Sequence, residues 1–306
     1  MRRFLHNENG FVENNEWLPN CWVNVECPDE DGVKFLTDDL NVPHAFLESV
    51  ADLDERPHTD SEGNWRLTII RIPMRSEDAP GTYVTLPLGI IMNDELIITL
   101  CYGYTDMIPD FIEHTRARGI DVSSEADFIL RLIYSSAFWY LRYLREISLR
   151  LKNYTSQLEK SIRNKDLLEI MNLQETLVFF NTSIRGNEMI LGKIHRIHKD
   201  NFNQDLLEDV EIELQQADNT VKIYTDILSS TMDSFASVIS NNVNDIMKKM
   251  TGVSIVLMIP TLVASFYGMN VEINYGNNPY AFWLILCGSL ALSVIVYIIL
   301  RKIRWL

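Results

Sequence analysis

The chain has 306 residues, of which 47% are hydrophobic and 23% are charged, and its formal net charge at pH 7 is −15. That acidity argues against a nucleic acid as partner, because phosphate binding requires a basic surface. The four cysteines form no Cys-x-x-Cys pair, so we expect neither a disulfide framework nor a cysteine zinc site. The charges are unevenly distributed: between Lys249 and Arg301 the sequence has one charged residue, Glu272.

Residues 1–124 are predicted to form an α/β domain. Runs rich in β-branched residues predict strands at 21–26, 65–74, 82–92 and 95–102, with Asn93-Asp94 as a hairpin turn. Helices are predicted at 42–51, 106–118 and 123–151, and further helix through 161–182. Residues 125–204 are therefore expected to be helical, and the chain before residue 205 is assigned to the α+β class.

A long helix is predicted from residue 205 onward. Residues 205–249 are expected to form a stalk, which runs without a break into the first apolar segment. Between Asp205 and Asp233 the stalk has eight carboxylates and one cation, Lys222. Apolar residues recur there at helical spacing, which indicates one buried face. If the helix is continuous to Tyr267, it extends about 95 Å at roughly 1.5 Å per residue.

Two apolar segments are predicted to cross a membrane. Residues 250–267 and 279–300 contain no charge, and each is long enough for a bilayer core of about 30 Å. Lys248 and Lys249 precede the first span, and Arg301 follows the second within a basic tail, residues 301–306, whereas residues 268–278 contain no Lys or Arg. The positive-inside rule then places both termini in the cytoplasm and the short loop outside. We expect a multi-pass protein of the plasma (inner) membrane with a cytoplasmic α+β domain.

A stripe of small polar residues and methionines follows one face of the first span and the stalk. Steps of three and four residues place its members on one helical face. The stripe consists of Asp233, Ser237, Ser240, Asn244, Met247, Thr251, Ser254, Met258, Thr261 and Ser265. Such a stripe avoids lipid and faces protein or water. Helix packing explains small polar residues as well, but the stripe's continuity favours a pore. Two spans cannot enclose a pore, so a pore requires several copies.

The first span is followed by Tyr267-Gly268-Met269-Asn270. A Gly-Met-Asn triplet that closes the first of two C-terminal spans, with a basic tail after the second, resembles the CorA-type divalent-cation transporters. Residues 241–248 resemble that family's junction between stalk and membrane. Leu47-Glu48 through Arg56-Pro57 resembles its cytoplasmic Leu-Glu-Asp and Arg-Pro segment. The resemblance covers most of the chain, most closely from residue 205 onward.

The resemblance implies a funnel-shaped homopentamer whose pore is lined by the first span. Asn270 then forms the outer selectivity ring, and Gly268 and Met269 shape the turn before it. Asp233, Asn244, Met258 and Thr261 match pore-facing positions of the family and all belong to the stripe. Met250 matches a hydrophobic gate position, and Met258 offers a second apolar constriction that could close the pore by dewetting.

The resemblance also implies regulation by cytoplasmic magnesium through carboxylates between subunits, at positions matched by Glu48 and Asp209. Ser49 departs from the pattern, because the family commonly has aspartate there. The outer loop, residues 271–279, also departs, because it lacks the family's Met-Pro-Glu-Leu stretch.

The function expected from these features is passive, channel-like transport of hydrated divalent cations into the cytoplasm. Magnesium is the expected ion, both transported and regulatory, with cobalt or nickel as further cargo. No catalytic residue is expected, and the protein is not predicted to be an enzyme. Two alternatives remain: a ZntB-type zinc transporter of the same fold, and a membrane-anchored sensor or scaffold whose spans only tether the acidic domain. The polar stripe separates transport from tethering, because an anchor does not need one.

Overall fold

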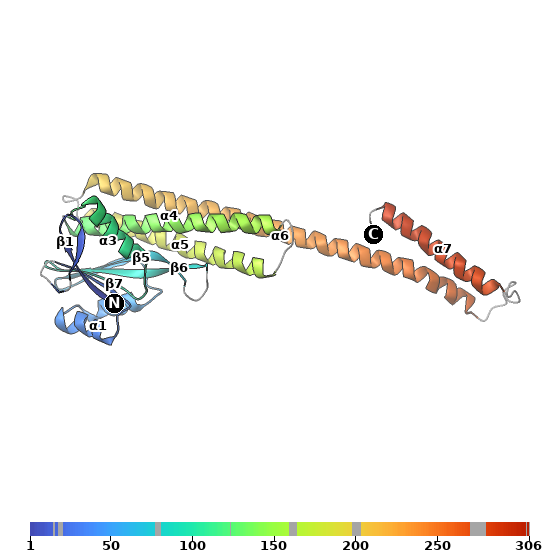
Figure 1. The fold of residues 1–306 in the computed structure, drawn as a ribbon, viewed down its shortest axis with the longest axis horizontal. Coiled ribbons are helices and arrows are strands. Elements are labelled where there is room, and N and C mark those ends of the chain that lie inside the picture. Colours follow the sequence, from blue (N-terminus) through green and yellow to red (C-terminus); the bar gives the residue numbers. More distant parts are fainter. Residues whose placement is uncertain are drawn as a thin grey trace. The chain divides into compact units, whose positions relative to one another are not determined.

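The computed structural model describes residues 1–14, 16–17, 21–76, 81–122, 124–158, 164–197, 203–269, 280–303 and 305 (Figure 1). The chain divides into two compact units, Met1–Ser229 and Ser230–Leu306. The first unit contains the sheet and the helices that cover it. The second contains the two long apolar segments.

The first unit is built on a seven-stranded sheet of order β2-β1-β3-β7-β6-β5-β4. The strands are β1 (Arg2–Asn7), β2 (Phe11–Asn14), β3 (Trp22–Glu26), β4 (His58–Glu62), β5 (Trp65–Arg75), β6 (Tyr83–Met92) and β7 (Ile97–Cys101). Strands β3 and β7 pair in parallel, and the other neighbours pair antiparallel. The predicted hairpin turn at Asn93-Asp94 is confirmed, since Asn93 N donates to Leu96 O at 3.0 Å between β6 and β7.

One face of the sheet is covered by α1 (Glu30–Lys34), η1 (Phe35–Asp39) and α2 (His44–Ala51). Alternate strand residues such as Val23, Ile69 and Ile98 form one buried cluster with Phe46 and Val50. Strand side chains alternate between faces, so every second residue reaches this cluster. Helix α2 packs closely on β6, because a Cβ built on Gly89 would lie 2.3 Å from a Val50 methyl group.

The opposite face is covered by α3 (Met107–Arg118), α4 (Glu125–Leu158) and α5 (Asn164–Ile197). Aromatic side chains fill this second layer: Trp22 of β3 lies 5.8 Å from Phe111 of α3 and 5.1 Å from Phe128 of α4, centroid to centroid. Tyr140 of α4 packs edge-on against Phe180 of α5 at 4.9 Å. Edge-to-face pairs of this kind stabilise a core beyond their buried area.

The predicted elements match the structure at most positions. The four predicted strands correspond to β3, β5, β6 and β7, and the predicted helices correspond to α2, α3 and α4. The helix predicted through residue 182 runs on to Ile197 as α5. Strands β1, β2 and β4 were not predicted. Each is short or rich in charged and polar residues, so it carries little hydrophobic periodicity.

Helix α6 (Gln204–Tyr267) is continuous over 64 residues, as the sequence predicted. The Asn203 side chain caps its start by accepting from Leu206 N at 3.1 Å. In the first unit α6 buries one apolar face, which includes Leu207, Val210 and Leu214. Pro260 lies inside the helix and does not end it.

Helix α7 (Ala281–Lys302) follows α6 and runs back along it in Figure 1. Both helices are long and apolar enough to cross a membrane, judged by length and composition, and most of their apolar side chains are exposed in the single chain. On α7 the buried positions are Ser289, Ser293 and Leu300. These helices fit the two predicted spans.

Candidate functional site

The polar stripe lies on one exposed face of α6. All ten of its residues, from Asp233 to Ser265, belong to the described helix and are exposed in the single chain. Met247 and Met258 expose 60% and 62% of their surface. The chain's own residues therefore leave the whole stripe uncovered.

Helix α7 does not cover the stripe. Within residues 250–267, the positions that are most covered are Gly252, which is buried, and Val256, Ile259, Pro260 and Val263, which are partly buried. At about 100° of rotation per residue, Gly252, Val256, Ile259 and Val263 form the centre of this covered face, roughly opposite the stripe, and Pro260 lies at its edge. Within one chain, α6 therefore packs through its apolar face, and its polar face remains available for contact with water or with another copy of the chain.

Three hydroxyl groups of the stripe present acceptors to their surroundings. Ser254 Oγ donates to Met250 O at 2.9 Å, Thr261 Oγ1 to Leu257 O at 3.2 Å, and Ser237 Oγ to Asp233 O at 3.1 Å. Because each hydroxyl proton is used within the helix, its oxygen lone pairs face outward. The water molecules around a hydrated cation donate hydrogen bonds, so this surface is chemically suited to contact them.

The triplet at the end of α6 is only partly described. Gly268 N donates to Ala264 O at 2.9 Å and Met269 N to Phe266 O at 3.4 Å, so the helix closes with a turn directly after Tyr267. Met269 is 55% exposed. Asn270, the residue predicted to form the selectivity ring, and the loop that follows it to residue 279 lie outside the described residues. Met250, the predicted gate, is 67% exposed beside the stripe.

Glu48 and Asp209, the predicted regulatory carboxylates, belong to different layers of the first unit. Glu48 lies on α2, and its side chain is 72% exposed with Oε1 3.4 Å from His44 Nδ1. Asp209 lies on α6, near α3 and α4 on the other side of the sheet. Over the described ranges, no three His, Cys, Asp or Glu side chains converge as a metal site would require. A single chain therefore does not bring these two carboxylates together.

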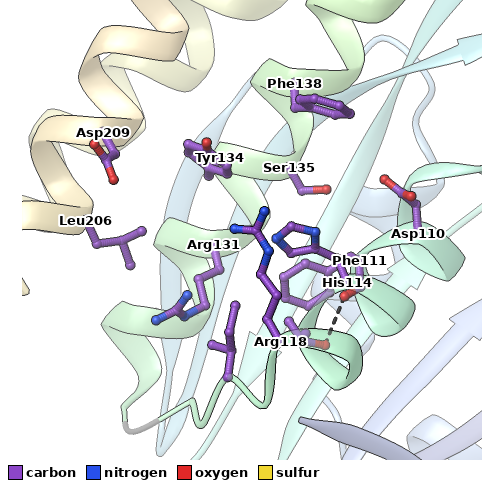
Figure 2. Close-up of a pocket in the computed structure, with 12 residues that line it drawn as sticks. Asp110, Phe111, His114, Arg118, Arg131, Tyr134, Ser135, Phe138, Leu206 and Asp209 are labelled. Atoms are coloured by element: carbon purple, nitrogen blue, oxygen red, sulfur yellow. Dashed lines mark hydrogen bonds between the residues drawn. The ribbon is translucent and has the colours of Figure 1, made fainter.

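A cavity of about 290 Å³ opens beside Asp209, between α3, α4 and the start of α6 (Figure 2). Its polar lining includes His114 and Arg118 of α3 and Arg131, Tyr134 and Ser135 of α4, and its other lining residues are Asp110, Phe111, Thr115, Ile120, Phe138, Leu206 and Asp209. Burial raises the pKa of the Tyr134 phenol, the nearby Glu213 and Asp209 carboxylates raise it further, and Arg118 opposes them.

Apart from Asp209, sequence reasoning did not single out these cavity residues. A signal was present, because His114 and Arg118 are four residues apart on α3, and Arg131, Tyr134, Ser135 and Phe138 share one face of α4. However, only the packing of three helices shows that these two faces meet.

Comparison with known proteins identifies the family. The model of the CorA-like Mg2+ transporter protein family matches residues 19–302. This chain belongs to that family. The predicted resemblance is therefore confirmed over most of the chain.

The relatives of this CorA-like chain have low sequence identity to it, but they align with it over most of their length. It is 24% identical over 300 residues to the cobalt/magnesium transport protein CorA of Methanocaldococcus jannaschii, with 93% of this chain and 91% of the relative covered. It is 22% identical to the protein of the same name from Thermotoga maritima, with 93% and 83% covered.

Two solved structures show the same fold. The complete CorA magnesium transporter of M. jannaschii superposes with a TM-score of 0.83 at 21% identity, covering 100% of this chain and 99% of the other. The ZntB cytoplasmic domain of Vibrio parahaemolyticus gives a TM-score of 0.61 at 14% identity, covering 79% and 98%. The predicted α+β domain followed by a long helix and two apolar spans is thus confirmed as the CorA architecture.

Proposed function

We propose that this CorA-like protein is a channel-like transporter that carries hydrated divalent cations, with magnesium as the principal ion, into the cytoplasm. The observation that supports this most is the acceptor-rich stripe of α6, which lies away from the face that packs in the single chain. Its relatives from M. jannaschii and T. maritima are described as cobalt/magnesium transport proteins, which supports the same ion class.

The pore is proposed to form from several copies, with a homopentamer as the expected assembly. Each chain contributes two helices that can span a membrane, and two helices cannot surround a water-filled path. A symmetric ring places one α6 stripe from each copy around a central axis. Residues 250–267 then line the membrane part of the path, and Asp233 to Asn244 line its continuation through the stalk.

The proposed selectivity ring consists of Asn270 from each copy, held by the turn at Gly268 and Met269. Magnesium dehydrates reluctantly and usually retains several waters. An amide oxygen accepts hydrogen bonds from these waters without the full charge that would hold the ion in place. A filter must bind the ion well enough to admit it and weakly enough to release it.

The proposed gate consists of Met250 and Met258. These side chains are unbranched and apolar, so a narrow ring of them would exclude water and stop conduction by dewetting. Magnesium on the cytoplasmic side is proposed to favour this closed state by bridging Glu48 of one copy and Asp209 of the next. Carboxylate oxygens suit magnesium, and Ser49 contributes only a neutral hydroxyl at the position beside Glu48.

Zinc transport is the second candidate. The fold likeness to the ZntB cytoplasmic domain supports it as a member of the same architecture. The stripe contains no Cys or His, and these are the ligands that zinc prefers for direct coordination. Zinc would therefore have to pass as a hydrated ion, as magnesium does.

Ion uptake into liposomes that contain the full-length protein tests the proposal. We expect magnesium uptake that is driven by a membrane potential, needs no pH gradient, and is blocked by cobalt hexammine, a mimic of the hydrated ion. Zinc uptake that requires a pH gradient would select the second candidate. Absence of uptake for magnesium, cobalt and zinc, from protein shown to be assembled, would select the anchored sensor or scaffold.

A further inference from the structure

The turn that follows α2 is held by an arginine of the central sheet. Helix α2 closes with Asp52 N donating to Glu48 O at 3.2 Å. Arg71 of β5 then fixes the chain beyond, because its Nη1 donates to Leu53 O at 2.9 Å and to Glu55 O at 2.8 Å. The donors of a guanidinium lie in one rigid plane, so two carbonyls on one nitrogen orient the turn. The proposed regulatory carboxylate Glu48 therefore lies one helical turn before this anchor.

Arg71 is in turn bound to helix α5 by two routes. The Asn187 amide pairs with its backbone, since Oδ1 accepts from Arg71 N at 2.8 Å and Nδ2 donates to Arg71 O at 2.7 Å. The second route passes through Thr85 of β6, whose Oγ1 accepts from Arg71 Nε at 3.1 Å and from Ser183 Oγ at 2.9 Å. Asn187 and Ser183 are 0% and 1% exposed. Hydrogen bonds in such a buried network hold the turn and α5 together firmly.

The residues next to Asn187 connect α5 to α6 and to the segment after α2. Arg185 Nε donates to Asp218 Oδ1 of α6 at 3.3 Å. Gly186 packs on Pro57, because a Cβ built on Gly186 would lie 2.6 Å from Pro57 Cγ. Successive helical residues point about 100° apart. The three residues from 185 to 187 thus reach three different neighbours: α6, the segment after α2, and β5.

We propose that Arg71, Asn187 and Arg185 form a relay that couples the turn after α2 to helix α6 of the same chain. These are positioning residues, since none of them belongs to the proposed metal site or pore. The inference deepens the proposed function and rests on it for the metal bridges between copies. In the proposed ring, Glu48 of a copy shares an ion with one neighbour, and Asp209 of that copy shares an ion with the other neighbour.

The relay gives successive magnesium sites a physical connection. Asp218 follows Asp209 by nine residues of one unbroken helix, which is about 13 Å at 1.5 Å per residue. A shift of α6 at Asp218 therefore also moves Asp209 and the stripe. An ion that fixes Glu48 on one side of a copy then favours the position of Asp209 that binds an ion on its other side. Closure by magnesium thereby becomes cooperative around the ring.

Hydrogen exchange in the full-length protein, measured by mass spectrometry in detergent, tests the coupling without any assay of transport. The first variant is Arg71→Lys, which keeps the charge and loses the planar fork. The second is Arg185→Gln, at a side chain that is 55% exposed, so the fold should tolerate it. The matched control is Arg196→Gln, an exposed arginine of α5 whose Nε donates to Gly192 O within the same helix.

Coupling between two sites is reciprocal, so each variant should act at the far end of the relay. We expect Arg71→Lys to speed exchange of the α6 amides around Asp218 by about threefold or more, as for residues of one hydrogen-bonded network. Arg185→Gln should do the same to the amides of residues 52–55. Arg185→Lys should restore slow exchange there, because it keeps a cation beside Asp218. The control should change neither region.

The inference is overturned if each variant changes exchange only beside its own substitution. Amides of β3 and β7, in the same sheet but outside the relay, separate a coupled change from a general loss of stability. Circular dichroism melting identifies a variant that fails to fold. If Arg71→Lys fails, Arg185→Gln decides alone, through the exchange of residues 52–55.

Uptake at varied internal magnesium then tests the role in regulation. Arg185→Gln should transport like the wild type at low internal magnesium, but inhibition should be less steep, approaching that of independent sites. A merely structural role would not change the steepness selectively. Unchanged steepness in Arg185→Gln would refute the regulatory role of the relay.

The two measurements keep the relay and the proposed function apart. Reciprocal changes in exchange, with no cation uptake by the wild type, would support the relay and refute transport. Cation uptake with equally steep inhibition in the wild type and Arg185→Gln, and only local changes in exchange, would support transport and refute the relay.

Discussion

At the residue scale, the proposed pathway is lined by oxygen acceptors with little formal charge. Ser237, Ser254 and Thr261 use their hydroxyl protons within α6, so their oxygens remain available to the waters of a hydrated ion. Asp233 is the stripe's one carboxylate and lies in the stalk, outside the predicted span. An ion would therefore meet a full charge only beyond the membrane segment.

Asn270→Ala is expected to reduce magnesium uptake by at least about tenfold. The variant loses the ring of amide oxygens that would accept hydrogen bonds from the waters bound to the ion, in place of bulk solvent. Uptake of magnesium into liposomes measures the effect, and the assembly state should not change. Asn277→Ala, in the same loop, is the control and should transport normally. Normal uptake by Asn270→Ala would remove this residue from the proposed filter.

Met250→Asp is expected to make the closed channel leak. A ring of carboxylates would wet an apolar constriction and attract cations, so current should persist at cytoplasmic magnesium concentrations that close the wild type. Single-channel or whole-bilayer recording measures this. Met250→Leu keeps the constriction apolar and should close normally. A closed-state current equal to that of the wild type would place the gate elsewhere.

Asp209→Ala is expected to raise the cytoplasmic magnesium concentration needed for closure, because one carboxylate of the proposed bridge is lost. The measurement is inhibition of uptake as internal magnesium is varied. Glu208→Ala changes an adjacent exposed carboxylate of α6 and serves as the control. Equal inhibition of Asp209→Ala and the wild type would exclude Asp209 from sensing.

At the scale of elements, a buried carboxylate links α5 to α6. Asp218 is 5% exposed and accepts from Arg185 Nε at 3.3 Å and from Lys222 Nζ. Burial raises the pKa of Asp218, but the hydrogen bonds from Lys222 and Arg185 outweigh burial, so the pKa is lowered from its ordinary value. The link therefore stabilises the packing of α6 against α5 within the first unit when the carboxyl is ionised.

Asp218→Asn is expected to lower the free energy of unfolding at pH 7 by about 2 kcal/mol, a typical value for hydrogen bonds to charged groups. Because the folded pKa is depressed, this stability is present above the unfolded value of about 3.9 and is lost as the pH falls through the folded pKa. Denaturant unfolding followed by circular dichroism at pH 7 and near pH 3 should show the difference shrinking in acid. Asp226→Asn, an exposed carboxylate of the same helix, should change stability little at either pH.

At the scale of the whole molecule, the flanking charges predict a membrane topology. Lys248 and Lys249 before the first span, and Arg301 and Lys302 after the second, should keep both ends of the chain in the cytoplasm. In right-side-out vesicles, tags at either terminus should resist an impermeant protease, and a cysteine placed at Asn277 should react with an impermeant maleimide. Native Cys287 lies inside α7 and is replaced by serine beforehand. Protease-sensitive termini would reverse the orientation.

Features of the chain that depend on local order were predictable from the sequence. The two apolar spans, the unbroken α6 and the polar stripe are patterns within one helix, where hydropathy and periodicity act over short distances. The central strands β5 and β6 were also predictable, because they are long and rich in β-branched residues.

Features that depend on contacts between distant segments required the tertiary structure. Strand β4 forms from the polar residues His58–Glu62 only because β5 supplies its hydrogen-bonding partners, and β1 forms beside β3 in the same way. Three-dimensional packing, rather than periodicity, determines which side of α6 is covered in the single chain. The exposure of the stripe follows from that packing. The same holds for the separation of Glu48 from Asp209 and for the cavity where Arg118, Tyr134 and Leu206 meet. A sheet with helices on both faces determines which distant side chains come together, and no local sequence pattern encodes that arrangement.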